Sequence, residues 1–84
     1  MAAKALRALR EGRGLSQSRA AQVCGLTQTT ISMLELGRVS DPRWSTLRAL
    51  ARGYKLSVAD IARAVRQSVA DNGTLRQKRR GDRA

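Results

Sequence analysis

Apolar residues recur along this chain at helical spacing, and residues that favour helix ends separate the apolar stripes. The first stripe lies in "KALRAL" and predicts a helix from about Ala3 to Glu11. The "GRG" that follows is typical of a helix end, with Gly14 suited to a left-handed cap. Ser16 then predicts the N-cap of a second helix that Gly25 ends. The inward face of this second helix is expected to consist of Ala20, Ala21 and Cys24.

The stretch "GLTQTTISMLELG" predicts a third short helix, capped by Thr27 and ended after Leu36 by Gly37. One side of this helix is expected to be buried and consists of Thr27, Ile31 and Leu34. The opposite side carries no charge and consists of Gln28, Thr29, Ser32, Met33 and Leu36. A solvated helix face normally carries Lys and Glu, so this surface is a candidate for contact with a partner.

Two further helices complete the pattern. Asp41 and Pro42 predict the N-cap and first turn of a fourth helix, whose apolar stripe consists of Leu47, Leu50 and Ala51. Trp44 is expected to plug the core at the start of this helix. Ser57 predicts the N-cap of a fifth helix, whose long stripe consists of Val58, Ile61, Ala62, Val65 and Val69.

The pattern as a whole predicts an all-α domain of five helices, without strands, over residues 1–70. Residues 71–84 lack apolar periodicity and are expected to form a flexible, disordered basic tail. The stripe of the fifth helix is longer than one small domain needs, which predicts a homodimer with Ile61, Val65 and Val69 in the subunit contact. The alternative is that the fifth helix folds back on its own domain.

Composition narrows the choice of partner and of chemistry. The chain has 84 residues, 17 of them Lys or Arg against 6 Asp or Glu, and a formal net charge of +11, which indicates a polyanionic partner. It contains no His, its carboxylates are scattered, and it has no glycine-rich phosphate loop, so an enzyme is not expected. A single cysteine, Cys24, excludes an intrachain disulfide and a zinc cluster, and is expected to be a small core residue. No stretch is apolar enough for a membrane span, and we expect a cytoplasmic, nucleoid-associated protein without cofactors.

The second and third helices are joined by "VCGLT", a glycine turn followed by an apolar residue and a capping Thr, which is typical of a helix-turn-helix. The chain resembles the lambda-repressor-like, or Cro-type (XRE), DNA-binding domains over about residues 5–62. The resemblance rests on the ordered succession of "GLSQ", "GLTQTTIS", "LG", "P" and "TL". In proteins of this kind the third helix lies in the major groove of DNA and the second crosses the backbone.

The resemblance implies a role for each matching residue. The base-reading positions are Gln28, Thr29, Ser32 and Met33, and the backbone-contacting positions are Gln17, Arg19, Arg38, Arg43 and Arg10. Arg10 and Glu35 occupy positions at which many relatives form a partly buried ion pair. The uncharged side of the third helix, which carries the base-reading positions, contains no Arg. This argues against guanine readout by the third helix, so we expect its contacts to be mostly with A·T pairs.

Three residues depart from the family pattern. Arg19 lies in the first turn of the second helix, where relatives favour Glu and the helix dipole favours an acid. Leu36 replaces a residue that is usually polar, which weakens the transfer of any DNA contact there. Lys55 stands where relatives usually have Gly and is expected to adopt a left-handed conformation.

The resemblance implies a sequence-specific regulator of transcription that binds an inverted repeat in double-stranded DNA as a dimeric repressor. The alternative is an antitoxin, a small domain that binds a protein toxin as well as its own promoter. In that case the basic tail would hold the toxin, whereas in the first case it is an electrostatic arm on DNA. RNA binding is disfavoured because the chain has few aromatic residues to stack unpaired bases.

Overall fold

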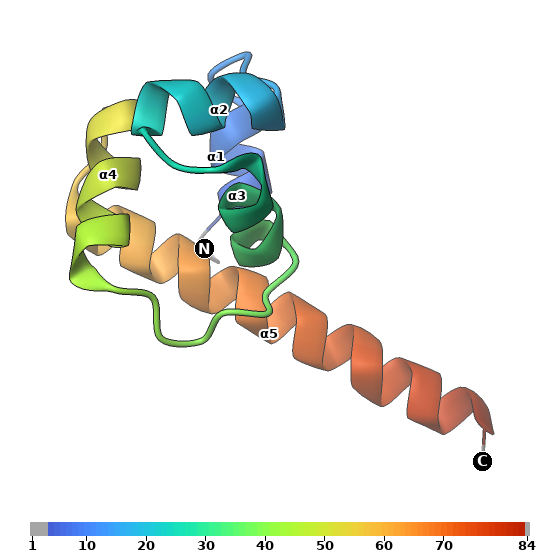
Figure 1. The fold of residues 1–84 in the computed structure, drawn as a ribbon. Helices are drawn as coiled ribbons and strands as arrows, with labels where there is room; N and C mark the ends of the chain where they lie inside the picture. The colour runs from blue at the N-terminus through green and yellow to red at the C-terminus, as the bar shows by residue number, and fades with distance from the viewer. Residues whose placement is uncertain (1–3, 84) are drawn as a thin grey trace.

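The computed structural model describes residues 4–83, with side chains described for residues 4–73. Five helices and no strands are formed within this range (Figure 1). Their bounds are α1 Leu6–Glu11, α2 Gln17–Cys24, α3 Gln28–Glu35, α4 Trp44–Tyr54 and α5 Val58–Arg83. The expected all-α fold class is confirmed. Among the described residues, no helix is both long enough and apolar enough to cross a membrane.

The first helix begins later than its apolar stripe predicted. α1 starts at Leu6 because Ala5 is extended, with φ −69° and ψ 163°. Ala5 has no side chain that could cap the helix, and the Leu6 N–H donates instead to Ser68 Oγ of a distant segment. The predicted start at Ala3 lies outside the described residues. Gly14 is left-handed as expected, with φ 68°, but it follows the helix cap at Gly12 rather than forming it.

A single apolar core lies between the helices, and each helix contributes to it. The largest of the fully buried side chains are Leu6, Ile31, Leu34, Leu50, Tyr54 and Ile61. Small residues of α2, Ala20 and Ala21, let that helix lie close to the others. Tyr54 was not predicted to be a core residue, and Thr27, which was, is exposed and serves only as the cap of α3.

Cys24 is confirmed as a small core residue. Its side chain is buried, and burial raises the pKa of its thiol. A Cβ on Gly53 would lie 2.3 Å from the Cys24 sulfur, so α2 and α4 approach each other with no room for a side chain. The thiol therefore fills space between two helices, and its raised pKa keeps it protonated and unreactive at neutral pH.

The start of α4 differs from the prediction. Arg43, not Asp41, is the N-cap residue, and its side chain forms no capping hydrogen bond. Trp44 was expected to plug the core but is 63 % exposed. Trp44 is the first residue of α4, and its side chain lies outside the core, whereas Tyr54, the last residue of the same helix, is 1 % exposed and fills the core instead.

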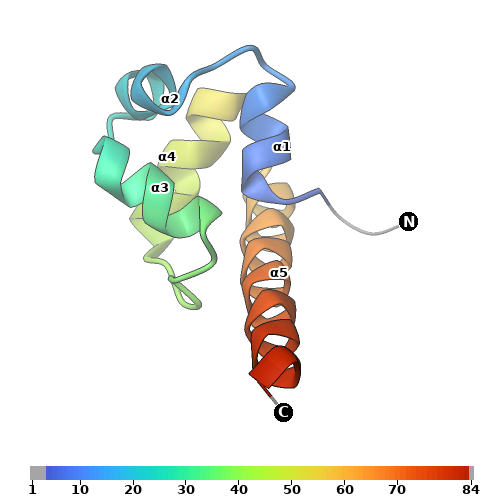
Figure 2. The ribbon, with the colours of Figure 1, turned by 90° about the vertical axis from the view of Figure 1, so that its right-hand side faces the viewer.

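Helix α5 is the longest element, and it corrects the predicted subunit contact. Ile61 and Val65, predicted to form a subunit contact, are 0 % and 2 % exposed within the chain's own core, so α5 folds back on its own domain. The backbone of α5 is helical to Arg83 and continues beyond the other four helices (Figure 2). Lys, Arg and Gln favour helix, and no Pro interrupts this stretch, so the helix can continue without an apolar stripe. The predicted cap is present, since Ser57 Oγ accepts a hydrogen bond from the Asp60 N–H.

The left-handed conformation expected of Lys55 is confirmed. Its φ is 57° and its ψ is 46°, and its N–H donates to the carbonyl of Arg52. Lys55 therefore ends α4 in the manner usually left to glycine, at a modest cost in backbone strain.

Tyr54 makes the stability of the fold depend on pH at the alkaline end. Burial is the main cause that raises the pKa of its hydroxyl from 10.0 to about 12. Between these values the unfolded chain loses the phenolic proton and the folded chain keeps it, so unfolding is favoured as pH rises. We expect the free energy of unfolding to fall by about 2–3 kcal/mol more in the wild type than in Tyr54→Phe between pH 10 and 12. Urea unfolding at several pH values measures this difference, and parallel pH profiles of the two proteins would contradict it.

Candidate DNA-binding interface

Helices α2 and α3 and the turn between them form a helix-turn-helix (Figure 1). The N-cap residue of each helix caps it with a side-chain hydroxyl. Ser16 Oγ accepts a hydrogen bond from the Arg19 N–H, and Thr27 Oγ1 accepts one from the Thr30 N–H. Between them Gly25 is left-handed, with φ 69°, and its N–H bonds back to the last turn of α2. The turn is open enough to admit a side chain, so Gly25 is required for its backbone conformation. The predicted joint between the two helices is thus confirmed.

The uncharged side of α3 faces away from the core. Ile31 and Leu34 are 1 % and 2 % exposed, whereas Gln28 and Thr29 on the other side are exposed. Around this outer side lies an open hollow, lined by Gln17, Gln28, Thr29, Ser32, Met33, Leu36 and Arg38. The structure therefore brings together all four predicted base-reading residues and two of the predicted backbone contacts.

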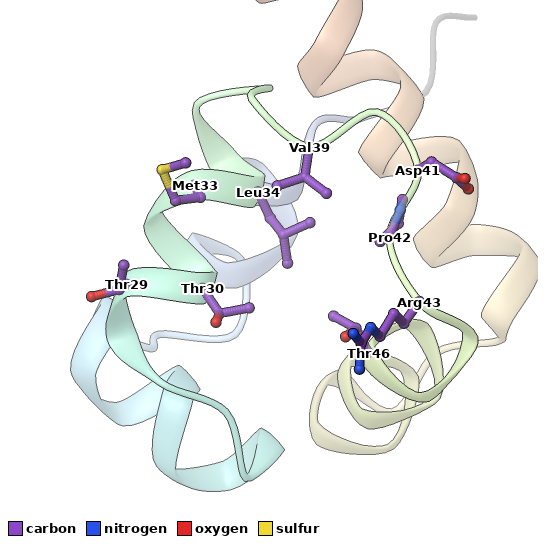
Figure 3. Close-up of a pocket in the computed structure, with 9 residues that line it drawn as sticks. All are labelled: Thr29, Thr30, Met33, Leu34, Val39, Asp41, Pro42, Arg43 and Thr46. Atoms are coloured by element: carbon purple, nitrogen blue, oxygen red, sulfur yellow. The ribbon is translucent and has the colours of Figure 1, made fainter.

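A second hollow, of about 410 Å³, lies between α3 and the start of α4 (Figure 3). Thr30, Leu34 and Val39 point into this space, and Arg43 and Thr46 close it from the α4 side (Figure 3). Thr29 and Met33 line both hollows, so the two form one continuous surface along α3. Arg38 and Arg43 are exposed at its edge, one after α3 and one before α4.

Arg19 lies apart from these two hollows. It is exposed in the first turn of α2, where its guanidinium donates to the Gln22 Oε1 at 3.0 Å. The positive side chain thus extends along α2 rather than toward α3. Its predicted contact with a phosphate would be made by α2 alone.

A buried ion pair ties α1 to the end of α3. Arg10 Nε lies 2.6 Å from Glu35 Oε2, and Arg10 Nη2 donates to Glu35 Oε1 at 3.1 Å. The two side chains are 10 % and 4 % exposed. The hydrogen bond that Arg10 donates to the Glu35 carboxylate is the main cause that raises the pKa of Arg10, so the guanidinium stays charged at any working pH. Arg10 Nη1 donates to the carbonyl of Leu15 at 2.7 Å, which also attaches the loop before α2.

The phosphate contact predicted for Arg10 is therefore wrong. Its guanidinium is occupied by Glu35 and Leu15 and has little surface left for DNA. The burial that makes the ion pair strong also removes Arg10 from the surface, so its role is to hold the helices in place. The predicted ion pair itself is confirmed.

The structure adds one contact that the sequence did not suggest. Gln17 Nε2 donates to Glu35 Oε1 at 3.2 Å, which holds the first residue of α2 against the last residue of α3. Gln17 also lines the hollow beside Gln28. The only sequence signal was that both residues lie near the core edge of helices expected to pack together, which does not identify a partner.

Comparison with known proteins agrees with this geometry. A family model described as a helix-turn-helix domain matches residues 2–64. The HTH-type transcriptional regulator PuuR of Escherichia coli (strain K12) and that of Shigella flexneri are each 46 % identical to this chain over 58 residues. The match covers 69 % of this chain and 31 % of each relative, so the chain spans about a third of the length of these curated relatives. No solved structure matches significantly. The chain belongs to the helix-turn-helix family of DNA-binding domains, and within it to the Cro-like (XRE) kind that its motifs indicated.

Proposed function

We propose that this chain binds double-stranded DNA in a sequence-specific manner and regulates transcription as a dimeric repressor of an inverted-repeat operator. The observation that carries the proposal is the uncharged, exposed side of α3 between Arg38 and Arg43. A surface with polar but uncharged groups can hydrogen-bond to base edges in the major groove, while flanking cations hold the phosphates.

Base recognition is assigned to four residues of α3. Gln28, at the exposed start of the helix, can form two hydrogen bonds with N6 and N7 of adenine. Thr29 and Met33 lie side by side along the same surface and offer methyl groups for contact with thymine. Ser32, one turn beyond Gln28, adds a short hydroxyl. These side chains together favour a half-site in which α3 reads mostly A·T pairs.

The DNA backbone is assigned to the edges of the same surface. Gln17, held by Glu35, would present its amide to a phosphate beside the first recognition residue. Arg19, Arg38 and Arg43 are exposed cations placed before, after and opposite α3. A net charge of +11 adds a long-range attraction to DNA that salt would weaken.

A dimer would place two copies of α3 in successive major grooves on one side of the duplex, about 34 Å apart. Of the three predicted subunit contacts, Val69 alone keeps side-chain surface outside the core, and we assign the contact to it. A dimer bound across an operator excludes other proteins from the same DNA, which is the simplest route from binding to repression.

Selection of bound fragments from a random pool of DNA, at a salt concentration near physiological, tests the proposal. We expect an inverted repeat with A·T pairs under Gln28 and Thr29. On the selected operator Gln28→Ala should weaken binding about 10-fold or more, because a bidentate contact to a base is lost. Gln67→Ala, the same change on α5 at a half-buried residue that lines neither hollow, is the control and should bind as the wild type does.

Two results would overturn the proposal. If no sequence is enriched and binding fades steeply with salt, the chain binds DNA by charge alone. If Gln28 and Thr29 both lie over G·C pairs, the assignment of base contacts is wrong. Operator binding by the isolated chain would also show that no protein partner is needed. An antitoxin that reads DNA only together with its toxin would not bind the operator alone.

A further inference from the structure

The backbone turn that ends α3 lies directly against the backbone of α5 (Figure 1). Gly37 is buried and left-handed, with φ 74°. A Cβ built on it would lie 2.2 Å from the carbonyl oxygen of Ser68 and 2.8 Å from the Cβ of Asn72. No side chain fits between the two segments, so the position of α5 determines where α3 ends.

This part of α5 is itself held firmly on its other side. Ser68 is 2 % exposed, and its Oγ accepts a hydrogen bond from the Leu6 N–H at 3.2 Å. The same hydroxyl donates to the carbonyl of Ala64 at 3.0 Å. The turn of α5 that meets Gly37 is therefore fixed to the first residue of α1, and it provides a rigid support.

The peptide group between Gly37 and Arg38 is held at both ends. Its carbonyl oxygen, from Gly37, accepts a hydrogen bond from Asn72 Nδ2 at 3.4 Å. Its N–H, from Arg38, donates to the carbonyl of Met33 in α3 at 3.1 Å. One peptide plane thus links the recognition helix to α5, and its orientation determines the direction in which the Arg38 side chain leaves the backbone.

The Arg38 side chain lies between two hollows of the surface, one beside α3 and one beside α5. It lines the hollow at the uncharged outer side of α3 together with Gln28 and Met33. It also lines a separate hollow beside α5, together with Asn72 and Val69. A backbone that is held in place limits the positions that the guanidinium of an exposed arginine can reach. This lowers the entropic cost of placing the guanidinium on a phosphate.

We propose that Asn72 of α5 is a positioning residue for DNA binding, which orients the Gly37–Arg38 peptide so that Arg38 meets the DNA backbone after α3. This inference rests on the proposed function, since it takes Arg38 as a phosphate contact. It extends the set of residues that support DNA binding to α5, a helix whose described side chains, up to residue 73, do not line the hollow at the outer side of α3.

The test compares Asn72→Ala with the matched control Gln67→Ala, which removes an amide side chain from the same helix. On the selected operator Asn72→Ala should weaken binding about fivefold and lower the dependence on salt by about one phosphate contact. In the Arg38→Ala background the same change should cost less than about twofold, because the residue it positions is gone. Gln67→Ala should have no effect in either background.

A readout without DNA separates this inference from the proposed function. Asn72→Ala should speed hydrogen exchange at the Arg38 amide about fivefold and leave that of Ile31, in the middle of α3, unchanged. Equal losses of affinity in the wild-type and Arg38→Ala backgrounds would indicate a general effect on the fold and overturn the inference. Unchanged exchange at Arg38 would overturn it as well, even if the wild type binds its operator. If exchange changes as expected but no operator is found, the proposed function fails and the link between α3 and α5 remains.

Discussion

Replacing Arg10 with methionine is expected to lower the free energy of unfolding by about 3–5 kcal/mol, a large part of the total for a domain of this size. The change removes the partner of Glu35 and leaves a carboxylate that is 4 % exposed without its cation. It also frees the carbonyl of Leu15, which attaches the loop before α2. Urea unfolding followed by circular dichroism at neutral pH measures the loss.

The double variant with Arg10→Met and Glu35→Leu separates charge from packing. An apolar pair of similar volume leaves no buried charge, so a large part of the lost stability should return. Arg7 and Glu11 form an exposed pair at 3.6 Å, with side chains 71 % and 55 % exposed, and Arg7→Met is the control. It should change stability by less than about 1 kcal/mol. A double variant no more stable than Arg10→Met would show that the hydrogen bonds to Leu15 and Gln17, not the charge, carry the effect.

Gly37→Ala is expected to lower the free energy of unfolding by about 2–4 kcal/mol, because two costs combine. The left-handed backbone is unfavourable for alanine by about 1 kcal/mol or more. The new methyl group would also lie 2.2 Å from the carbonyl oxygen of Ser68, and a backbone atom cannot move aside as a flexible side chain would. Thermal and urea unfolding measure the sum of both effects.

Gly14→Ala is a matched control for this prediction. Gly14 is left-handed too, with φ 68°, but a Cβ built on it meets nothing within 4 Å. Its substitution should therefore show the backbone cost alone, about 1 kcal/mol. Equal losses at the two glycines would contradict the close approach of α3 and α5. The Gly37 variant should also bind DNA more weakly than its stability loss explains, since it displaces the peptide that carries Arg38.

Local signals in the sequence predicted the helix-turn-helix well. Ser16, Thr27 and Ser57 cap the helices that they were expected to cap, because a capping hydroxyl acts on N–H groups only two or three residues away. Gly25 and Lys55 end their helices in left-handed conformations for the same local reason. The ordered motifs of the Cro-like family then indicated which helix would read DNA.

Predictions that depended on which face of a helix the other helices cover were less successful. Ile61 and Val65 were assigned to a subunit contact, yet an apolar stripe has the same appearance whether it meets its own domain or a second copy. Trp44 and Tyr54 lie at opposite ends of α4, and size and polarity alone favoured the wrong one for the core. The sequence allowed Arg10 to bind a DNA phosphate as well as Glu35. In the structure its side chain is 10 % exposed and paired with Glu35, which leaves little of it accessible to a phosphate.

The sequence by itself determined the five helices, the caps at Ser16, Thr27 and Ser57, the turn between α2 and α3, and the uncharged side of α3, since each depends on residues close together in the chain. The tertiary structure alone decided that Gln17 is held by Glu35, that Gly37 lies against Ser68, and that Asn72 meets the end of the recognition helix. These contacts join residues 18 to 35 positions apart, and whether they form depends on how the helices pack, which no local pattern specifies.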